Sequence, residues 1–206
     1  LDFEGRWTRH TLMPPLLRPD PLETGPPPIW LAALGPRMTA LAGEVADGLL
    51  VHPFASRRHV AEANLPNLEI GMRAAGRGRD EVTVVVGVIV GLYETDDEAR
   101  RADAAVRGML GFYGSTPAYR PVLEAHGWGD LQPELRALTK ADRWGELGAR
   151  YDDEQVRTLA VIGTPGVVAR ELHARFGHLA DRLALSLPGP RRPELLAALA
   201  DAYAAG

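Results

Sequence analysis

The sequence of 206 residues contains no cysteine, which excludes disulfide bonds and thiolate chemistry. Lysine is nearly absent as well, because Lys140 is the only lysine among 23 basic residues. The net charge of −4 lacks the basic excess that is typical of nucleic-acid-binding surfaces. No apolar run approaches the roughly 20 residues of a membrane-spanning helix. We therefore expect a cytoplasmic globular protein that binds neither nucleic acid nor a membrane.

Several motifs of catalytic sites are missing too. The chain has no His-Glu-x-x-His motif and no cluster of histidines with carboxylates, so we predict no metal site. It also lacks the Gly-x-Ser-x-Gly motif of serine hydrolases, the Walker phosphate loop and the dinucleotide motif Gly-x-Gly-x-x-Gly. The residues alone therefore leave the catalytic side chains unknown.

Residues 28–54 are the most informative stretch, because they read as strand, turn, helix and second strand. Residues 29–33 are an apolar run that ends at Gly35-Pro36, and a proline suits the first position of a helix. Apolar residues then recur at helical spacing until Asp47-Gly48, and residues 49–52 restart an apolar strand. This order predicts two parallel strands of an α/β protein.

The turn between the first strand and its helix is the main candidate binding site. Backbone N–H groups at a helix start, here near Gly35 and Arg37, attract an anion, and this geometry favours a phosphate. The alternative is a tight connection that binds nothing. The residues of this candidate site are Ala32, Ala33, Leu34, Gly35, Pro36, Arg37 and Met38.

His52 is the second candidate, since it follows a strand at the end where (β/α)8 barrels place their active-site side chains. Pro53 and Phe54 are expected to form walls of a substrate pocket beside it. A lone histidine at a strand end can equally have a structural role. The sequence alone leaves both interpretations open.

Four apolar segments are expected to be parallel strands, namely 29–33, 49–52, 82–92 and 181–187. Helices are expected between them, including one over 56–75 with a kink at Pro66 and one over 152–161. Thr95 and Glu98 match a capping box that opens another helix. The alternation of strands and helices gives the α/β class.

Residues 112–150 have several helical pieces and no strand signal, so they read as a helical excursion from the alternating pattern. For its aromatic residues Tyr113, Tyr119 and Trp128, packing is favoured over a lid. Four strands are half of an eight-stranded barrel, and a complete barrel takes about 250 residues. Half a barrel leaves two open sheet edges. We therefore predict that residues 1–206 form one domain that is incomplete as a barrel.

Residues 27–38 (PPIWLAALGPRM), continued by residues 41–48 (LAGEVADG), carry a resemblance to a known family. Residues 3–6, 112–119 and 180–183 fit the same family. The chain resembles the luciferase-like monooxygenase superfamily, and within it the branch that uses the deazaflavin coenzyme F420. This resemblance implies a TIM (β/α)8 barrel of which the chain supplies strands five to eight, together with a helical insertion.

The resemblance also implies roles for the two candidate sites. Backbone groups of residues 32–37 would help to hold the coenzyme phosphate or tail, and His52 and Phe54 would lie near the ring or the substrate. Family members transfer hydride between F420 and a small organic substrate, or use reduced FMN to activate oxygen. The first four strands of the family, with its usual catalytic histidine, have no counterpart here. We therefore expect the parent protein to be active and the 206-residue chain alone to be inactive.

Three hypotheses follow for the function. The first is an F420-dependent oxidoreductase in truncated form, and the second is an FMN-dependent monooxygenase of the same superfamily. The third is a non-catalytic half-barrel that associates with another chain through its open edges. The expected partner is a small-molecule substrate, and a homo-oligomer is an open alternative.

Overall fold

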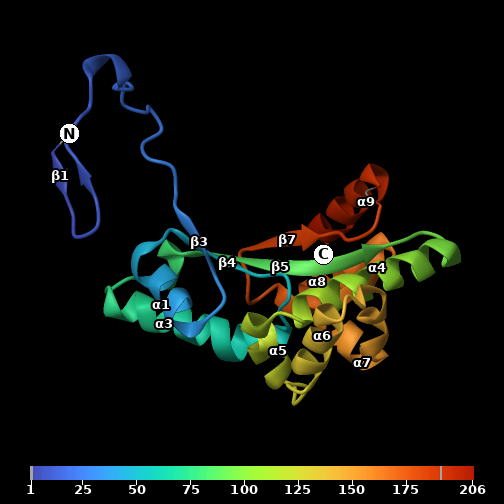
Figure 1. The fold of residues 1–206 in the computed structure, drawn as a ribbon. Helices are drawn as coiled ribbons and strands as arrows, with labels where there is room; N and C mark the ends of the chain where they lie inside the picture. The colour runs from blue at the N-terminus through green and yellow to red at the C-terminus, as the bar shows by residue number, and fades with distance from the viewer. Residues whose placement is uncertain (1, 191) are drawn as a thin grey trace.

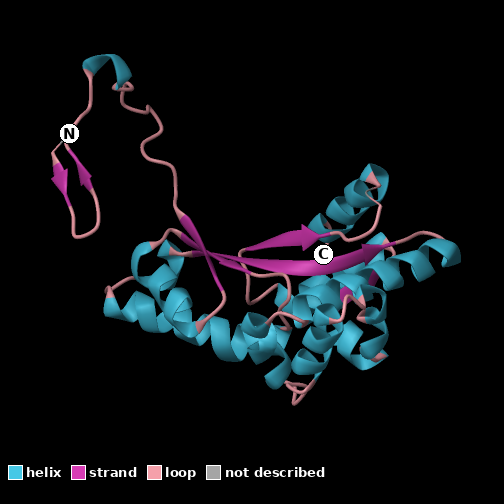
Figure 2. Cartoon of the chain, viewed as in Figure 1, coloured by secondary structure: helices cyan, strands magenta, loops and turns pink. Residues whose placement is uncertain are grey.

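The computed structural model describes residues 2–190 and 192–206 (Figures 1 and 2). The segment before residue 30 forms an arm that extends away from the rest of the chain (Figure 1). Within it, β1 (Phe3–Glu4) pairs antiparallel with β2 (Arg9–His10), and the single turn η1 (Pro15–Leu17) follows. The many prolines of this arm lack the N–H groups that longer helices and strands need.

A parallel sheet of five strands forms the centre of the chain. Its strands are β3 (Trp30–Ala33), β4 (Gly48–Val51), β5 (Thr83–Leu92), β6 (Ala160–Gly163) and β7 (Arg182–Ser186). Val85 pairs with β4 on one edge of β5 and with β7 on the other, and Ile89 pairs in the same way with β6 and β7. Strands β4 and β6 therefore lie one after the other along the same edge of β5.

Helices follow the strands in the order that a (β/α)8 barrel requires. They are α1 (Pro36–Val45), α2 (Arg57–His59) with the π-helical turn η2 (Val60–Asn64) and α3 (Leu65–Ala74), α8 (Pro165–Phe176) and α9 (Pro193–Ala204), with the short turn η3 (Arg79–Glu81) before β5. The strand order β3-β4-β5-β7 with intervening helices confirms the predicted α/β class. Among the described residues, no strand pairs with the outer edge of β3 or of β7.

The predicted kink at Pro66 is a π-helical turn. Leu65 donates its N–H to the carbonyl of Val60, five residues back, so the helix widens just before the proline. Pro66 has no N–H for the bond that an α-helix would make at this place. The expected helix over 56–75 is thus one continuous rod of α2, η2 and α3 with a local widening.

The helical excursion is confirmed, although it begins inside a long helix. Its elements are α4 (Asp96–Gly114), η4 (Pro117–Tyr119), α5 (Arg120–Glu124), α6 (Leu131–Lys140), η5 (Trp144–Glu146), η6 (Gly148–Arg150) and α7 (Asp153–Leu159). The start of α4 has the predicted capping box, because Thr95 Oγ1 accepts from the Glu98 N–H and Glu98 accepts from the Thr95 N–H. The excursion packs below the sheet in Figure 1.

The prediction of one helix over 152–161 is wrong. Helix α7 ends at Leu159, and the next four residues form strand β6, which pairs with Ile89–Leu92 of β5. Charged residues at helical spacing dominate the first half of this segment. The predicted helix therefore also included the short apolar run at its end. The free edge at the end of β5 favours the strand.

Two hydrophobic clusters pack against the sheet, one on each face. Alternate residues of β4 and β5, such as Leu49 and Val84, join a cluster with α1, α3, α8 and α9. Ile89 of β5 faces the other way and packs with Leu110 of α4 and Leu135 of α6. The excursion therefore covers the opposite face of the sheet toward the C-terminal end of β5. No helix in the described part of the chain is long and apolar enough to cross a membrane.

Candidate functional site

The turn after β3 presents backbone donors, as the sequence predicts. Gly35 is the N-cap of α1 in extended conformation, and Pro36 occupies the first helical position. Thr39 donates both its N–H and its hydroxyl to the Gly35 carbonyl, each at 3.0 Å. No side chain caps the start of α1 in the described structure, so the N–H groups of Arg37 and Met38 point out of the helix start. A Cβ added at Gly35 would meet no atom within 4 Å, so a side chain would fit at this position.

Long-range contacts fix α1 relative to the sheet. The N–H of Ile29 donates to the Asp47 carboxylate at 2.7 Å, and the Asp47 N–H donates to the Ile29 carbonyl at 2.8 Å. At the other end of α1, the Arg77 guanidinium donates to the carbonyls of Gly43 and Ala46. These bonds satisfy carbonyl groups that every helix leaves unpaired at its C-terminus. The turn after β3 is thus held by fixed elements on both sides.

His52 lies one residue beyond β4 within an aromatic cluster. Its imidazole stacks on Tyr119, with ring centroids 4.4 Å apart, and meets the edge of Tyr113 at 4.6 Å. The Tyr119 hydroxyl lies 3.1 Å from Nε2, and the N–H of Phe54 donates to Nδ1 at 3.0 Å. Burial lowers the pKa of His52 below its ordinary value, which favours the neutral ring.

The two candidate sites meet at one small cavity. Ala33 and Leu34 from the turn, together with His52 and Phe54, line a space of about 20 Å³. Such a volume holds about one water molecule. The remaining residues of the turn lie outside this cavity, and Pro53 packs against Gly87 of β5 instead.

A polar cluster that the sequence analysis did not identify lies behind this cavity. Ser56 Oγ accepts the N–H of His59 at 3.1 Å and lies 2.7 Å from His126 Nε2, while His126 stacks on Trp128. Burial lowers the pKa of both histidines. Asn64, only 4% exposed, lines the cavity, and its Oδ1 has no hydrogen-bond partner among the described residues. These partners lie up to 70 residues apart in the sequence, so no local pattern indicates them.

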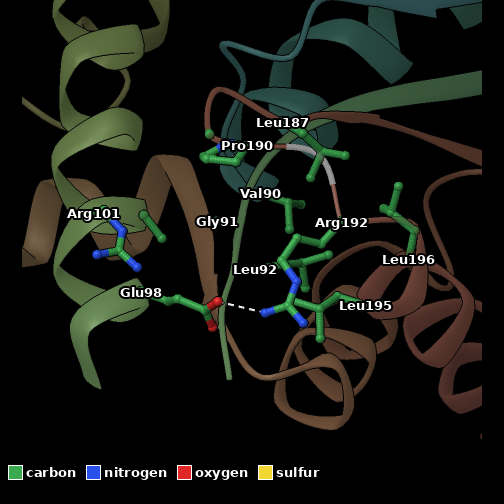
Figure 3. A pocket seen from close by; sticks show the side chains of 12 residues that line it. Val90, Gly91, Leu92, Glu98, Arg101, Leu187, Pro190, Arg192, Leu195 and Leu196 are labelled. Carbon is green, nitrogen blue, oxygen red and sulfur yellow. Dashed lines mark hydrogen bonds and ion pairs between the residues drawn. The ribbon is translucent and has the colours of Figure 1, made fainter. Parts of the chain in front are cut away.

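A larger cavity of about 210 Å³ lies at the C-terminal ends of β5 and β7, beside the starts of α4 and α9 (Figure 3). The ion pair between Glu98 and Arg192, 2.5 Å long, crosses it. Arg192 also contacts the carboxylates of Glu94 and Glu194, so three negative charges surround it. Most of the wall is aliphatic, and the charges do not favour an anion. In the described residues, no group of three histidines or carboxylates is placed to hold a metal ion.

Comparison with known proteins gives the family. The family model described as "Luciferase-like monooxygenase" matches residues 1–182. The chain belongs to the luciferase-like monooxygenase family. It is 42% identical to an uncharacterized protein of Mycobacterium tuberculosis over 183 residues, which cover 89% of this chain and 54% of that protein. It is 32% identical to 5,10-methylenetetrahydromethanopterin reductase of Archaeoglobus fulgidus over 157 residues, which cover 73% of this chain and 45% of that enzyme.

The fold is that of solved luciferase-like barrels. The coenzyme F420-dependent tetrahydromethanopterin reductase of Methanopyrus kandleri superposes with a TM-score of 0.69 at 22% identity, over 84% of this chain and 48% of that one. This match confirms the predicted architecture of a partial barrel. The chain spans about half the length of the curated relatives that it matches.

Proposed function

We propose that this chain is the coenzyme-phosphate-binding part of an F420-dependent oxidoreductase, which transfers hydride between F420 and a small organic substrate. The observation that carries the proposal is the open helix start at Gly35, with the His52 cluster on the next strand of the sheet. The relatives named as reductases support the oxidoreductase class, and the F420-dependent neighbour supports the coenzyme.

The residues present fit the phosphate-bearing tail of such a coenzyme. The N–H groups of Arg37 and Met38 and the guanidinium of Arg37 are suitable phosphate donors, and no side chain in the described structure caps this helix start. Leu34 and Met38, which are 37% and 45% exposed, offer apolar contact beside these donors. When bound, F420 supplies a ring that accepts or gives a hydride.

Substituting Gly35 tests the phosphate site. In Gly35→Asp, the added carboxylate would cap the helix N–H groups and repel a phosphate, while the extended conformation and open space at residue 35 accept the side chain. We expect F420 affinity, measured by fluorescence titration of the purified chain, to fall about 10- to 100-fold, as for lost charge-assisted hydrogen bonds. Gly35→Asn is the matched neutral control and should weaken binding less. Equal affinities for all three chains would contradict the proposal.

Two further measurements separate the alternatives. Parallel titration with FMN tests the flavin-monooxygenase hypothesis, which tighter FMN binding would favour. The chain of residues 1–206, given reduced F420 and candidate substrates, should show no turnover, whereas a protein that also supplies the other strands of a (β/α)8 barrel should. Turnover by the isolated chain would refute the expectation that its activity depends on the rest of a barrel.

The half-barrel hypothesis is favoured by one observation. The outer edges of β3 and β7 are unpaired in the described structure. Ala32 of β3 and Ala184 of β7, which alternate with the residues that pack against the helices, are exposed. Such edges can pair with another chain. Sedimentation equilibrium of the purified chain tests this association, and a monomer at all concentrations would argue against it.

A further inference from the structure

The hydroxyl of Tyr119 is held by His52 at the edge of the candidate site. We infer that Tyr119 is a ligand-binding residue, which donates a hydrogen bond to a carbonyl oxygen of the bound molecules, and that His52 is its positioning residue. The carbonyl belongs either to the coenzyme ring or to a ketone substrate. This inference rests on the proposed function, because it assigns a contact within the same site.

The hydrogen-bond pattern fixes which nitrogen of His52 carries the hydrogen. The backbone N–H of Phe54 points at Nδ1 from 3.0 Å, so Nδ1 must be the acceptor. A neutral imidazole with an acceptor at Nδ1 carries its hydrogen on Nε2. Nε2 therefore donates to the Tyr119 oxygen, which lies 3.1 Å away. A second proton on Nδ1 would face the Phe54 N–H, so this arrangement opposes protonation of the ring.

The direction of this bond leaves the hydroxyl of Tyr119 as a donor. Its oxygen accepts from His52, and its own hydrogen is directed elsewhere. Among the described residues, His52 is the group within hydrogen-bond distance of this hydroxyl. A donor so placed is complementary to an oxygen with lone pairs, such as a carbonyl. Tyr113 contacts the same imidazole through its ring edge and makes no hydrogen bond to it.

The position of Tyr119 fits contact with a ligand. It ends η4, in the excursion that covers the C-terminal side of the sheet, and its ring stacks on a histidine that follows β4. Active sites of (β/α)8 barrels lie at this end of the strands. Its neighbour Ala118 lines the small cavity that also contains Leu34 of the turn after β3. The turn after β3 and the residue next to Tyr119 thus line the same small cavity.

The first test measures the pair without any ligand. Nitrogen-15 NMR of histidine-labelled chain should show His52 as the neutral tautomer with hydrogen on Nε2 at pH 7. Tyr119→Phe should move the Nε2 resonance, whereas Tyr113→Phe, which removes a neighbouring hydroxyl, should leave it in place. Hydrogen on Nδ1, or equal spectra for the two variants, would overturn the assignment of His52.

The second test measures the donor. We expect Tyr119→Phe to weaken F420 binding by the chain about threefold to tenfold, the range for one neutral hydrogen bond, with Tyr113→Phe within twofold of the parent chain. Infrared difference spectra of the complex report the coenzyme carbonyl bands, and added cyclohexanone serves as the ketone probe. A shift of the coenzyme band in Tyr119→Phe identifies the ring as the partner, and a shift of only the ketone band identifies the substrate. If neither band nor the affinity changes, the inference is wrong.

Variants of His52 separate positioning from packing. His52→Gln keeps one acceptor and one donor and should bind F420 within about twofold of the parent chain. His52→Phe keeps an aromatic ring but no polar atom and should match Tyr119→Phe. The opposite order would show a packing role and overturn the positioning role. A parent chain that binds neither F420 nor FMN would refute the proposed function and the ligand contact together, while the NMR result would still decide the His52 tautomer.

Discussion

The crossing of α1 and α3 gives the sharpest prediction for stability, because two glycines bring the helix backbones into contact. A Cβ added at Gly71 of α3 would lie 1.8 Å from the carbonyl oxygen of Ala40 in α1. A Cβ added at Gly43 of α1 would lie 2.2 Å from the carbonyl oxygen of Leu68 in α3. Both obstacles are backbone atoms, which no rotation of a side chain can remove. Gly71→Ala therefore has to push the two helices apart.

The size of the effect follows from the distance. Real Cβ atoms do not approach other atoms closer than 3.0 Å, so the helices must separate by more than 1 Å at this point. Overpacking of this kind costs about 1–3 kcal/mol and occasionally more. Alanine gains back about 1 kcal/mol through its higher helix propensity. Because the obstacle is a backbone atom only 1.8 Å away, the cost should reach the upper end of this range, about 3 kcal/mol, and we expect Gly71→Ala to lose about 2 kcal/mol of unfolding free energy in total.

Gly108→Ala is the matched control in the middle of α4. A Cβ at Gly108 meets no atom within 4 Å, so this substitution should gain about 0.5–1 kcal/mol from propensity alone. In urea, with a slope of about 2 kcal/mol/M, the midpoint should fall by about 1 M for Gly71→Ala and rise slightly for Gly108→Ala. Far-UV circular dichroism follows the transition. A midpoint for Gly71→Ala at or above that of the parent chain would refute the close crossing of α1 and α3.

Three further changes test other parts of the structure. Gly114→Ala would place a Cβ 2.0 Å from the Tyr151 hydroxyl, so it should destabilise the chain by about 1–3 kcal/mol. In a double-mutant cycle monitored by urea unfolding, Tyr151→Phe should relieve part of that loss. Burial lowers the pKa of His59 and His126 in the folded chain, so the unfolded chain binds more protons near this pKa. The urea midpoint should therefore be constant well above pH 6.5 and fall as the pH drops below it. A midpoint that rises on acidification would contradict this sign. Arg77→Lys should cost about 1–2 kcal/mol in the same assay, since one ammonium group cannot replace a guanidinium that donates to three carbonyls, and an unchanged midpoint would show that this cap is unimportant.

Local chemistry explains why the sequence predicted the turn after β3 so closely. The strand, Gly35, Pro36 and the apolar spacing of α1 all lie within residues 30–45, and each has its effect through neighbours in the chain. The same holds for the capping box at Thr95 and for the widening before Pro66. In each case a missing N–H group or a side-chain acceptor determines the backbone nearby.

The contact between His52 and Tyr119 could not be predicted in the same way. The two residues are 67 positions apart, and Tyr119 reaches the imidazole because the excursion packs through Leu110, Leu135 and Ile89 against the sheet. Neither residue has a neighbour in the sequence that indicates its partner. The sequence could identify His52 as a candidate from its place after a strand, but its hydrogen-bond partner depends on the packing of helices that differ from the regular βα pattern.

Strand β6 is a different case, because the sequence held a signal for it. The sequence predicts one long buried strand over residues 82–92, and β5 has ten residues, whereas β4 has only four residues and pairs with the first part, 83–86. A buried strand must pair its backbone N–H and C=O groups on both edges, or it loses the free energy of those hydrogen bonds. The second half of β5 therefore required another short apolar strand on the same edge as β4. The run Ala160–Gly163, which ends just before the helix start at Thr164-Pro165, has the length and composition for that place. The length of one strand thus constrains what must pair with it, even where helical spacing dominates the local pattern.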